Sequence, residues 1–538
     1  MNPFLKLKNL SIVNKSLLLL VGLFFIYGLG IHFFDGILPI HEWRKTDSLS
    51  LTWNYANGAT LLSPETNFIS NAGNQNAAAE FPIVYFVVGK IWCIFGKYEW
   101  LAKLISFSTL FYALALFGKV VDHFYKNQRK TLIFIGIIFS SPVLIYYSDT
   151  LLPNVFAFAF LLYASYFLYA LLIEKRNNSW IYFTLFLTMA ILIKVTVLIA
   201  VLTFCGAALF YYLFHERNLF STHRRNFLMI LGSFGVALLC TYFWYTYAIK
   251  YNEKYSSTLF STTIRPIWEV DAQRRKEIWD LIWKYQFDML YHHIILIPSI
   301  LFVLYLAIRK KISAFFIWAI IIGLLGLTTY FILWFWVFDV HDYYLIEALF
   351  FPLIFLFVSI FKFNDIFENH KKTLRIISYT FITATILQAI SYTQIAFGND
   401  NVITKNTFFV SKFVKGNWGY FHWYHGDHLK KLQDQTSEIQ EIIKKDDTVL
   451  CITDPSPNIQ LYTIKRFGYT LQNFFDGGDK KVRIGELINK GADFMLVVGP
   501  EPLDSAVLNY TEVEVYAKNN IRVFDLNSFK SKNQIKPL

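Results

Sequence analysis

A short stretch near the N-terminus gathers several side chains that could do chemistry. Residues 41–47, His-Glu-Trp-Arg-Lys-Thr-Asp, hold one histidine, two acids and two bases directly after the first apolar segment. A carboxylate there could act as a general base that takes a proton from an attacking hydroxyl group. The simpler interpretation is a solvated helix on a membrane surface with ordinary charges. Asp47 is our candidate for the base, and Arg44 lies three residues before it.

Other charged or titratable side chains stand at the ends of apolar segments. Asp149 follows Tyr147-Ser148, where an acid is often only a helix cap. Glu80 precedes Phe81-Pro82, where it can simply favour the helix dipole. Lys194 ends an apolar segment, and a charge at that depth is costly unless it is paired, hydrated or extended to the membrane surface.

Histidines raise the alternative of a metal site. His341 begins a predicted short turn, His341-Asp342-Tyr343-Tyr344, and His292 and His293 precede another apolar helix. Together with Glu80, the pair His292 and His293 are candidate metal ligands, but their spacing is not diagnostic. Aromatic pairs near a membrane are usually interfacial belt residues. No cofactor follows with certainty, and a divalent metal is the open alternative.

The composition shows which elements must position these side chains. Of 538 residues, 55% are hydrophobic and only 16% are charged, which excludes an ordinary soluble protein and indicates a membrane protein with many spans. The net charge of +12 lies largely between apolar runs, so it reports membrane orientation and predicts no nucleic-acid partner. The four scattered cysteines show neither metal spacing nor a disulfide framework.

Eleven apolar segments approach the roughly 20 residues needed to cross a bilayer. They are about 16–34, 99–120, 131–148, 150–173, 180–197, 198–214, 227–249, 291–308, 312–336, 344–361 and 373–396. A further segment, 82–97, is shorter and contains Lys90. If it lies along the membrane surface, every short basic loop falls on the cytoplasmic side with the N-terminus. The positive-inside rule therefore predicts eleven spanning helices and an interfacial helix at 82–97.

This topology places loops 35–81 and 250–290, and everything after about residue 399, outside the cytoplasm. Residues 44–56 can form a short amphipathic helix. After residue 399 the pattern changes to alternating helices and strands, which indicates a small α/β domain. The expected elements are a helix at 430–445, strands at 448–453, 494–498 and 521–526, and a helix at 482–490 that Gly491 closes. We predict an all-α polytopic membrane domain, 1–398, and an extracytoplasmic α/β domain, 399–538.

The predicted topology brings charged groups from separate stretches to one face of the membrane. They are Asp47, Glu80, Asp149, Lys194 and His341. Unrelated caps and belt residues need not gather in this way. A pocket with acids and a cation at the outer leaflet suits a lipid phosphate donor and an acceptor that carries a hydroxyl group.

At these residues the sequence resembles the GT-C superfamily of membrane glycosyltransferases. The nearer branch contains the protein O-mannosyltransferases and the lipid A aminoarabinose transferases. The resemblance covers most of residues 16–360 through short motifs. These are Trp43-Arg44-Lys45-Thr46-Asp47 with Trp53-Asn54-Tyr55-Ala56-Asn57-Gly58; Glu80-Phe81-Pro82-Ile83-Val84-Tyr85 with Phe95-Gly96; Ser141-Pro142 with Tyr147-Ser148-Asp149; the His341-Asp342-Tyr343-Tyr344 turn; and the helix end at Lys194.

The resemblance implies transfer of a sugar from a polyprenyl phosphate at the outer face of the cytoplasmic membrane, with inversion. Asp47 would be the general base and Asp149 would orient the acceptor or Arg44. Glu80 and His341 would line the acceptor side or hold a metal, and the turn residues Asp342, Tyr343 and Tyr344 would bind substrate. Related enzymes can carry a lysine where this chain has Phe81, so the phosphate needs another cation. The candidates are Lys194, Arg44 and Arg265.

The sugar and the acceptor stay open, since lipid, glycan and protein hydroxyl groups all fit. A rival function is a transporter or flippase of a lipid-linked saccharide, which charges at mid-membrane depth or broken symmetric helices would favour. Most ionisable residues stand instead at the ends of the segments. A third interpretation, a membrane anchor for the C-terminal domain, leaves eleven helices and the outer acids unexplained.

Overall fold

The computed structural model describes most of the chain. The described residues are 10–215, 224–260, 263–366, 371–398, 409–454, 456–471, 479–500 and 503–532. Outside them lie Arg217, in the basic loop between the apolar segments 198–214 and 227–249, and Pro455, which follows the strand predicted at 448–453. Contacts divide the chain into two compact units, each built from separated segments. We call them the helical unit (Met1–Phe33, Lys103–Trp244, Thr263–Trp418) and the composite unit (Phe34–Ala102, Tyr245–Thr262, Gly419–Leu538).

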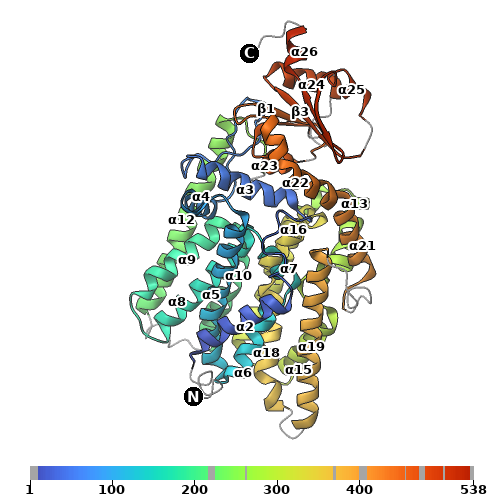
Figure 1. Cartoon of the computed structure of the whole chain (residues 1–538). Coiled ribbons are helices and arrows are strands. Elements are labelled where there is room, and N and C mark those ends of the chain that lie inside the picture. The colour runs from blue at the N-terminus through green and yellow to red at the C-terminus, as the bar shows by residue number, and fades with distance from the viewer. Residues whose placement is uncertain are drawn as a thin grey trace, which may run out of the picture. The chain divides into compact units, whose positions relative to one another are not determined.

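The helical unit consists of packed apolar helices, three of which run across its boundaries into the composite unit. Figure 1 shows α8 and α9 side by side, and α10 packs against α16 in the same way. The α-helices are α2 (Ile12–Ile26), α5 (Glu99–Tyr125), α6 (Gln128–Phe139), α7 (Pro142–Tyr147), α8 (Pro153–Leu172), α9 (Ser179–Ile193), α10 (Leu198–His215), α12 (Arg224–Lys254), α13 (Ala272–Leu281), α14 (Phe287–Leu290), α15 (His293–Ile308), α16 (Ala314–Leu333), α17 (Leu345–Ala348), α18 (Phe350–Ile366), α19 (Lys371–Ala396) and α21 (Lys412–Phe421).

Six helices of the described residues are long and apolar enough to cross a membrane, and two bent pairs raise that number to as many as eight. Three shorter apolar helices are α2, α4 (Ile83–Phe95) and α9. The all-α membrane domain with a small C-terminal sheet region is therefore confirmed. The count of eleven spans and the orientation of the termini stay predictions.

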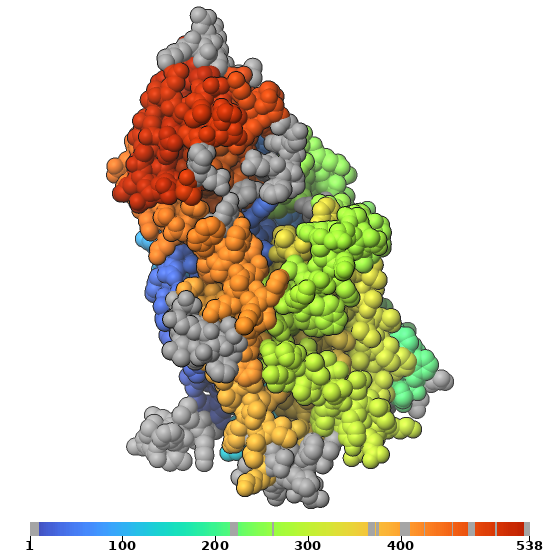
Figure 2. Space-filling view, turned by 90° about the vertical axis from the view of Figure 1, so that its right-hand side faces the viewer, coloured from blue at the N-terminus to red at the C-terminus, as the bar shows by residue number. Residues whose placement is uncertain are grey.

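Several predicted spans are interrupted, and the interruptions have local causes. The segment 131–148 forms two helices, because Ser141 is extended and Pro142, which lacks an N–H, starts α7. The segment around 291–308 is joined to α13 and α14 through an 84° bend, where Tyr291 is extended. Helices α13 to α15, yellow-green in Figure 2, form much of the surface of the helical unit that this view shows.

The composite unit combines two helices of the first loop with a five-stranded sheet. Figure 1 labels β1 and β3 beside α24 and α25 in the C-terminal segment. The strand order is β2-β1-β3-β5-β4, with β1 parallel to β2 and β3, and β5 antiparallel to β3 and β4. The elements are α3 (Glu42–Ala56), α4 (Ile83–Phe95), α22 (Asp427–Ile442), β1 (Thr448–Cys451), α23 (Ile459–Thr463), β2 (Phe467–Thr470), α24 (Lys480–Asn489), β3 (Phe494–Val498), α25 (Ser505–Leu508), β4 (Glu514–Lys518), β5 (Ile521–Asp525) and α26 (Asn527–Lys532).

The first loop is built into this sheet. Ile69 N–H donates to the Gly468 carbonyl oxygen at 2.7 Å, and Gly468 N–H donates to the Asn67 carbonyl oxygen at 3.2 Å. A Cβ atom at Gly468 would lie 1.8 Å from the Val449 carbonyl oxygen, so β2 approaches β1 too closely for any side chain there. Residues 67–69 thus extend the sheet beyond β2 and are fixed in position. The boundary predicted between residues 398 and 399 stays a prediction.

Candidate functional site

Helix α3 carries Asp47 and is buried along most of its length. It begins after His41, whose backbone is left-handed, and it packs against α4. A Cβ atom at Gly89 of α4 would lie 2.8 Å from Tyr55 Cβ and 2.9 Å from the Thr52 carbonyl oxygen. Only glycine allows this close approach of the two helices. The predicted helices at 44–56 and 82–97 are therefore both present, and α4 fixes one side of α3.

The Asp47 carboxylate is buried and held by a neutral amide. Its side chain is 4% exposed, and its Oδ1 accepts a hydrogen bond from Asn458 Nδ2 at 2.8 Å. Burial raises the pKa of Asp47 to about 6, while the charge of Arg44 and the Asn458 hydrogen bond oppose that rise. The charge of Glu80 also contributes to the raised pKa of Asp47. A carboxylate with this pKa is ionised at neutral pH and can still accept a proton, which suits a general base.

Beside Asp47, Arg44 forms a salt bridge with Glu80, whose Oε1 also accepts from the Tyr85 hydroxyl group. The Tyr85 hydroxyl oxygen lies 3.3 Å from Arg44 Nη2 and 3.4 Å from the Ser48 hydroxyl oxygen. The structure thus brings together three of the residues that the sequence singled out, Asp47, Arg44 and Glu80, within one unit. Arg44 is engaged by Glu80, so its charge is already balanced.

A second link joins α3 to the C-terminal segment. His425 Nδ1 lies 3.0 Å from Glu42 Oε1 at the start of the helix. Burial alone would raise the pKa of Glu42, but the hydrogen bond and charge of His425 outweigh it and lower that pKa. Glu42 is therefore an anion held at the N-terminus of α3, where the helix dipole also favours it.

Asp149 belongs to the helical unit and has a different partner. Its Oδ2 lies 3.0 Å from Lys103 Nζ, and both side chains are buried. Lys103 also donates to the His32 carbonyl oxygen at 3.0 Å. A buried pair of this kind is costly to break from one side. The prediction that Asp149 orients the acceptor or Arg44 is not tested by these contacts and stays a prediction.

Lys194 lies at the end of α9, over an aromatic ring. Its Nζ is 4.0 Å from the centre of the Tyr344 ring, a cation–π contact, and its charge interacts with that of Glu347. Glu347, a buried acid of α17, accepts from Asn154 Nδ2 at 2.7 Å and from the Tyr330 hydroxyl group at 3.3 Å. Lys194 therefore lies near an aromatic ring and an acid of the membrane domain, and no described residue forms a direct salt bridge with it as Glu80 does with Arg44.

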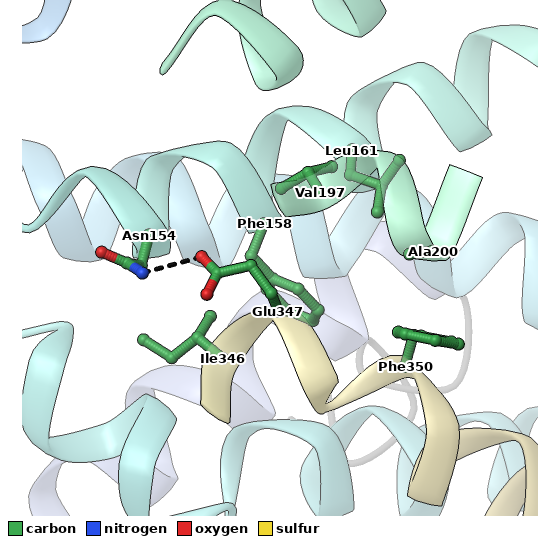
Figure 3. Close-up of a pocket in the computed structure, with 8 residues that line it drawn as sticks. All are labelled: Asn154, Phe158, Leu161, Val197, Ala200, Ile346, Glu347 and Phe350. Carbon is green, nitrogen blue, oxygen red and sulfur yellow. Dashed lines mark hydrogen bonds between the residues drawn. The ribbon is translucent and has the colours of Figure 1, made fainter. Parts of the chain in front are cut away.

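Glu347 lines a small pocket that is otherwise almost entirely apolar. Figure 3 shows its carboxylate turned toward Asn154, among side chains from α8, η1 (Val195–Val197), α10, α17 and α18. The lining residues are Asn154, Phe158, Leu161, Val197, Ala200, Ile346, Glu347 and Phe350. A single acid in an apolar pocket beside a lysine is a functional candidate that the sequence analysis did not name.

The predicted turn at 341–344 is a short 3₁₀ helix, η5 (Asp342–Tyr344). Asp342 is buried and accepts from the hydroxyl groups of Tyr147 and Tyr285, the latter at 3.0 Å. The His341 ring lies beside that of Tyr343, tilted by 41° and with ring centres 5.2 Å apart. The guanidinium of Arg265 lies 5.2 Å from the centre of the Trp336 ring. These residues belong to the helical unit, and their substrate-binding roles stay predictions.

The candidate metal ligands are divided between the units. Glu80 lies in the composite unit and pairs with Arg44, whereas His292 and His293 lie in the helical unit. There Asp288 joins the two histidines, with possible ligand atoms all within 4.8 Å of one another. His292 Nδ1 accepts from Ile294 N–H at 3.3 Å. Two imidazoles and a carboxylate are a donor set that fits Zn²⁺ or a similar ion.

Comparison with solved structures finds ArnT from Cupriavidus metallidurans, a lipid A aminoarabinose transferase of the GT-C superfamily. Its apo crystal structure matches with a TM-score of 0.58 and 11% identity, over 96% of this chain and 98% of that chain. The structure of the same protein bound to undecaprenyl phosphate matches with a TM-score of 0.56 and 10% identity, over the same shares. No protein-family model and no curated protein matches the sequence. The chain therefore has the ArnT-like fold, and the resemblance expected from the motifs is confirmed at the level of fold.

Several residues of these sites were missed by the sequence analysis. Asn458 is separated from Asp47 by 411 positions, and nothing local marks it. Lys103 and Glu347 carried a usable signal, because each is a charge inside an apolar segment. Tyr85 stood inside a quoted motif, but its hydroxyl group could be placed beside Glu80 only by the fold.

Proposed function

We propose that the chain is a membrane glycosyltransferase. It transfers a sugar from a polyprenyl-phosphate donor to an acceptor hydroxyl group at the outer face of the cytoplasmic membrane, with inversion and with Asp47 as general base. The observation that carries the proposal is the buried Asp47 carboxylate, whose pKa is raised to about 6, on an ArnT-like fold. The neighbour bound to undecaprenyl phosphate supports a polyprenyl-phosphate ligand for this fold.

The step is a single displacement. Asp47 takes the proton from the acceptor hydroxyl group as its oxygen attacks the anomeric carbon. The bond between that carbon and the phosphate oxygen breaks, and the lipid phosphate leaves with the electron pair. Because attack and departure occur on opposite faces, the configuration at that carbon inverts.

A cation must stabilise the charge that develops on the leaving phosphate. Arg44 is the weaker candidate, because Glu80 already balances it. Lys194 and Arg265 both lie over aromatic rings, those of Tyr344 and Trp336. We assign the phosphate to these two residues and leave Arg44 the task of holding Glu80.

The other predicted residues keep supporting roles in the proposal. Asp149 orients the acceptor, Glu80 and His341 line its side of the site, and Asp342 with Tyr343 and Tyr344 contributes to substrate binding. Asp288, His292 and His293 would hold a divalent ion, whose chemistry when bound is to polarise an oxygen ligand. The N-terminus lies in the cytoplasm and the C-terminal segment outside it.

The test is release of lipid phosphate. Purified full-length protein in detergent is incubated with a panel of undecaprenyl-phosphate sugars, and free undecaprenyl phosphate is measured by mass spectrometry. We expect release with one donor when an acceptor is present, and none with Asp47→Asn. Absence of release with every donor contradicts the proposal.

Transport of a lipid-linked saccharide is the second candidate. The buried Glu347, in a helix pair bent by 48°, favours it, because broken helices with internal charges are typical of transporters. The same donors placed in sealed vesicles separate the two functions. Movement of intact donor across the bilayer without cleavage supports transport, whereas cleavage supports transfer.

A further inference from the structure

The amide of Asn458 meets the carboxylate of Asp47. We propose that Asn458 is a positioning residue, which holds Asp47 in the orientation from which it takes the proton of the acceptor. This inference rests on the proposed function, in which Asp47 is the base. Asn458 itself is fully buried and does not need to touch substrate. The C-terminal segment would then be part of the catalytic machinery.

The orientation of the Asn458 amide follows from its other neighbours. Phe68 N–H donates to Asn458 Oδ1 at 3.1 Å, and a backbone N–H can only donate. The Ser50 hydroxyl group lies 3.2 Å from the same oxygen. The NH₂ group must therefore occupy the other end, which faces Asp47 at 2.8 Å. An NH₂ group only donates, so the Asp47 oxygen on that side is held as an acceptor.

Asn458 is itself fixed from the C-terminal side. It is the residue before α23, in a segment that Asp454 ties together. Asp454 accepts from Ser456 N–H at 2.9 Å, from the Ser456 hydroxyl group at 2.8 Å and from Gln460 N–H at 2.6 Å. The Ser456 oxygen accepts in turn from Ile459 N–H at 2.9 Å. This local network leaves the Asn458 side chain little freedom.

From the other side, the first loop holds the acceptor end of the amide. Asn67 N–H donates to the Ser50 oxygen at 2.7 Å, and Asn67 Nδ2 donates to the Arg466 carbonyl oxygen at 3.0 Å. Residues 67–69 are also paired with β2. Helix α3, the first loop and the C-terminal segment thus converge on one hydrogen bond. A side chain that only filled space would not need this arrangement.

The hydrogen bond from Asn458 also affects the pH range over which Asp47 is protonated. The charged groups that act on Asp47 are Arg44 on its own helix and Glu80 before α4, and Tyr85 of α4 binds Glu80. The Asn458 donor stabilises the ionised form and opposes the effect of burial on the pKa of Asp47. Without that donor, the pKa of Asp47 should rise further.

The test follows the protonation of Asp47 directly. Infrared difference spectroscopy of the purified full-length protein detects protonated carboxyl groups as the pH changes, and Asp47→Asn identifies the Asp47 signal. Asn458→Asp keeps the oxygen that Phe68 N–H needs but places a second carboxylate against Asp47. Two facing carboxylates share one proton, so we expect the midpoint to move up by about 1 pH unit or more.

Two variants complete the experiment. Asn509→Ala changes an exposed asparagine of the same C-terminal segment and should leave the midpoint unchanged. The exchange variant, Asp47→Asn with Asn458→Asp, keeps the same pair of groups. Asn458→Asp should lower the Tm, because two carboxylates then face each other, and the exchange variant should recover that loss. The exchange variant should transfer no sugar, because the carboxylate has moved.

The outcomes separate the two proposals. A midpoint in Asn458→Asp equal to that of the unmodified protein overturns the positioning role, and so does an exchange variant with a Tm no higher than that of Asn458→Asp. If Asp47→Asn keeps normal turnover, the proposed function itself fails. If Asp47→Asn is inactive and both Asn458 results are negative, only the positioning role is lost.

Discussion

Two buried aspartates of the chain have opposite surroundings. Asp47 accepts a hydrogen bond from the neutral amide of Asn458, whereas Asp149 lies 3.0 Å from the ammonium group of Lys103. A neutral donor orients a carboxylate and leaves it able to take a proton. A paired cation balances the charge of the carboxylate instead, and such a buried pair is costly to break from one side. Burial alone therefore does not separate the proposed base from an acid paired with a cation, and the partners of the two acids are what differ.

The largest effect expected from this comparison is on turnover. Asp47→Asn removes the proposed base but keeps the size of the side chain, and general bases contribute roughly 10²- to 10⁴-fold to rate. We expect transfer to fall by about that factor while the protein still inserts and purifies normally. Initial rates with the undecaprenyl-phosphate sugar panel measure it. A loss of less than tenfold would remove Asp47 from the base role.

The next largest effect is on the stability of the folded protein, and it concerns Asp149. Asp149→Asn leaves Lys103 buried without its anion, which costs about 3–5 kcal/mol in comparable buried pairs. Thermal unfolding in detergent should show a large drop in Tm. The double variant Lys103→Met with Asp149→Leu should recover much of it. If Asp149→Asn unfolds like the unmodified protein, the contrast between the two aspartates is wrong.

A smaller effect concerns the stability of Asp47→Asn. The pKa of Asp47 in the folded state, about 6, lies above the roughly 3.9 of an unfolded chain. Stability from this group is therefore present at low pH and is lost as the pH rises through about 6. Above about pH 7, Asp47→Asn should be more stable than the unmodified protein by up to about 3 kcal/mol. The gain should vanish below about pH 4; a gain that is the same at both pH values contradicts the burial argument.

The smallest expected effect concerns the phosphate. Lys194→Gln removes the cation that lies over Tyr344 and should raise the KM for the lipid donor about tenfold, since a hydrogen bond to a charged group contributes about 1.5–3 kcal/mol. Arg309→Gln is the matched control, because Arg309 also lies over a ring, that of Tyr305 at 5.9 Å, on the predicted cytoplasmic side. Equal KM values for both variants would take Lys194 out of the phosphate site.

Local sequence patterns predicted the helix that carries Asp47 and several other elements of the composite unit. The helix at 44–56, the helix at 82–97 and the strands β1, β3 and β5 follow from periodicity and turn residues, and all are present. Strand β2 was missed because it has four residues and contains Gly468, and β4 because its side chains are mostly exposed. The interruptions at Pro142 and Tyr291 come from the local backbone, which an average of hydropathy over a segment does not report.

Partners distant in the sequence could not be predicted. The predicted topology placed five residues on one face of the membrane: Asp47, Glu80, Asp149, Lys194 and His341. It could not predict which side chain each of them contacts. Within the composite unit the fold brings Glu80 to Arg44 and Tyr85. It also brings Asn458 to Asp47 across 411 positions. Such contacts depend on the tertiary structure, because neither composition nor spacing records them.

The most direct test of the account is the pH dependence of transfer by the full-length protein. Initial rates of undecaprenyl phosphate release, measured at low donor concentration, report the base of the free enzyme. The account predicts that kcat/KM falls on the acid side with a midpoint near pH 6, the pKa of Asp47, and that Asp47→Glu moves this midpoint. A rate that stays constant from about pH 7 down to pH 4.5, or an acid limb unchanged in Asp47→Glu, contradicts it.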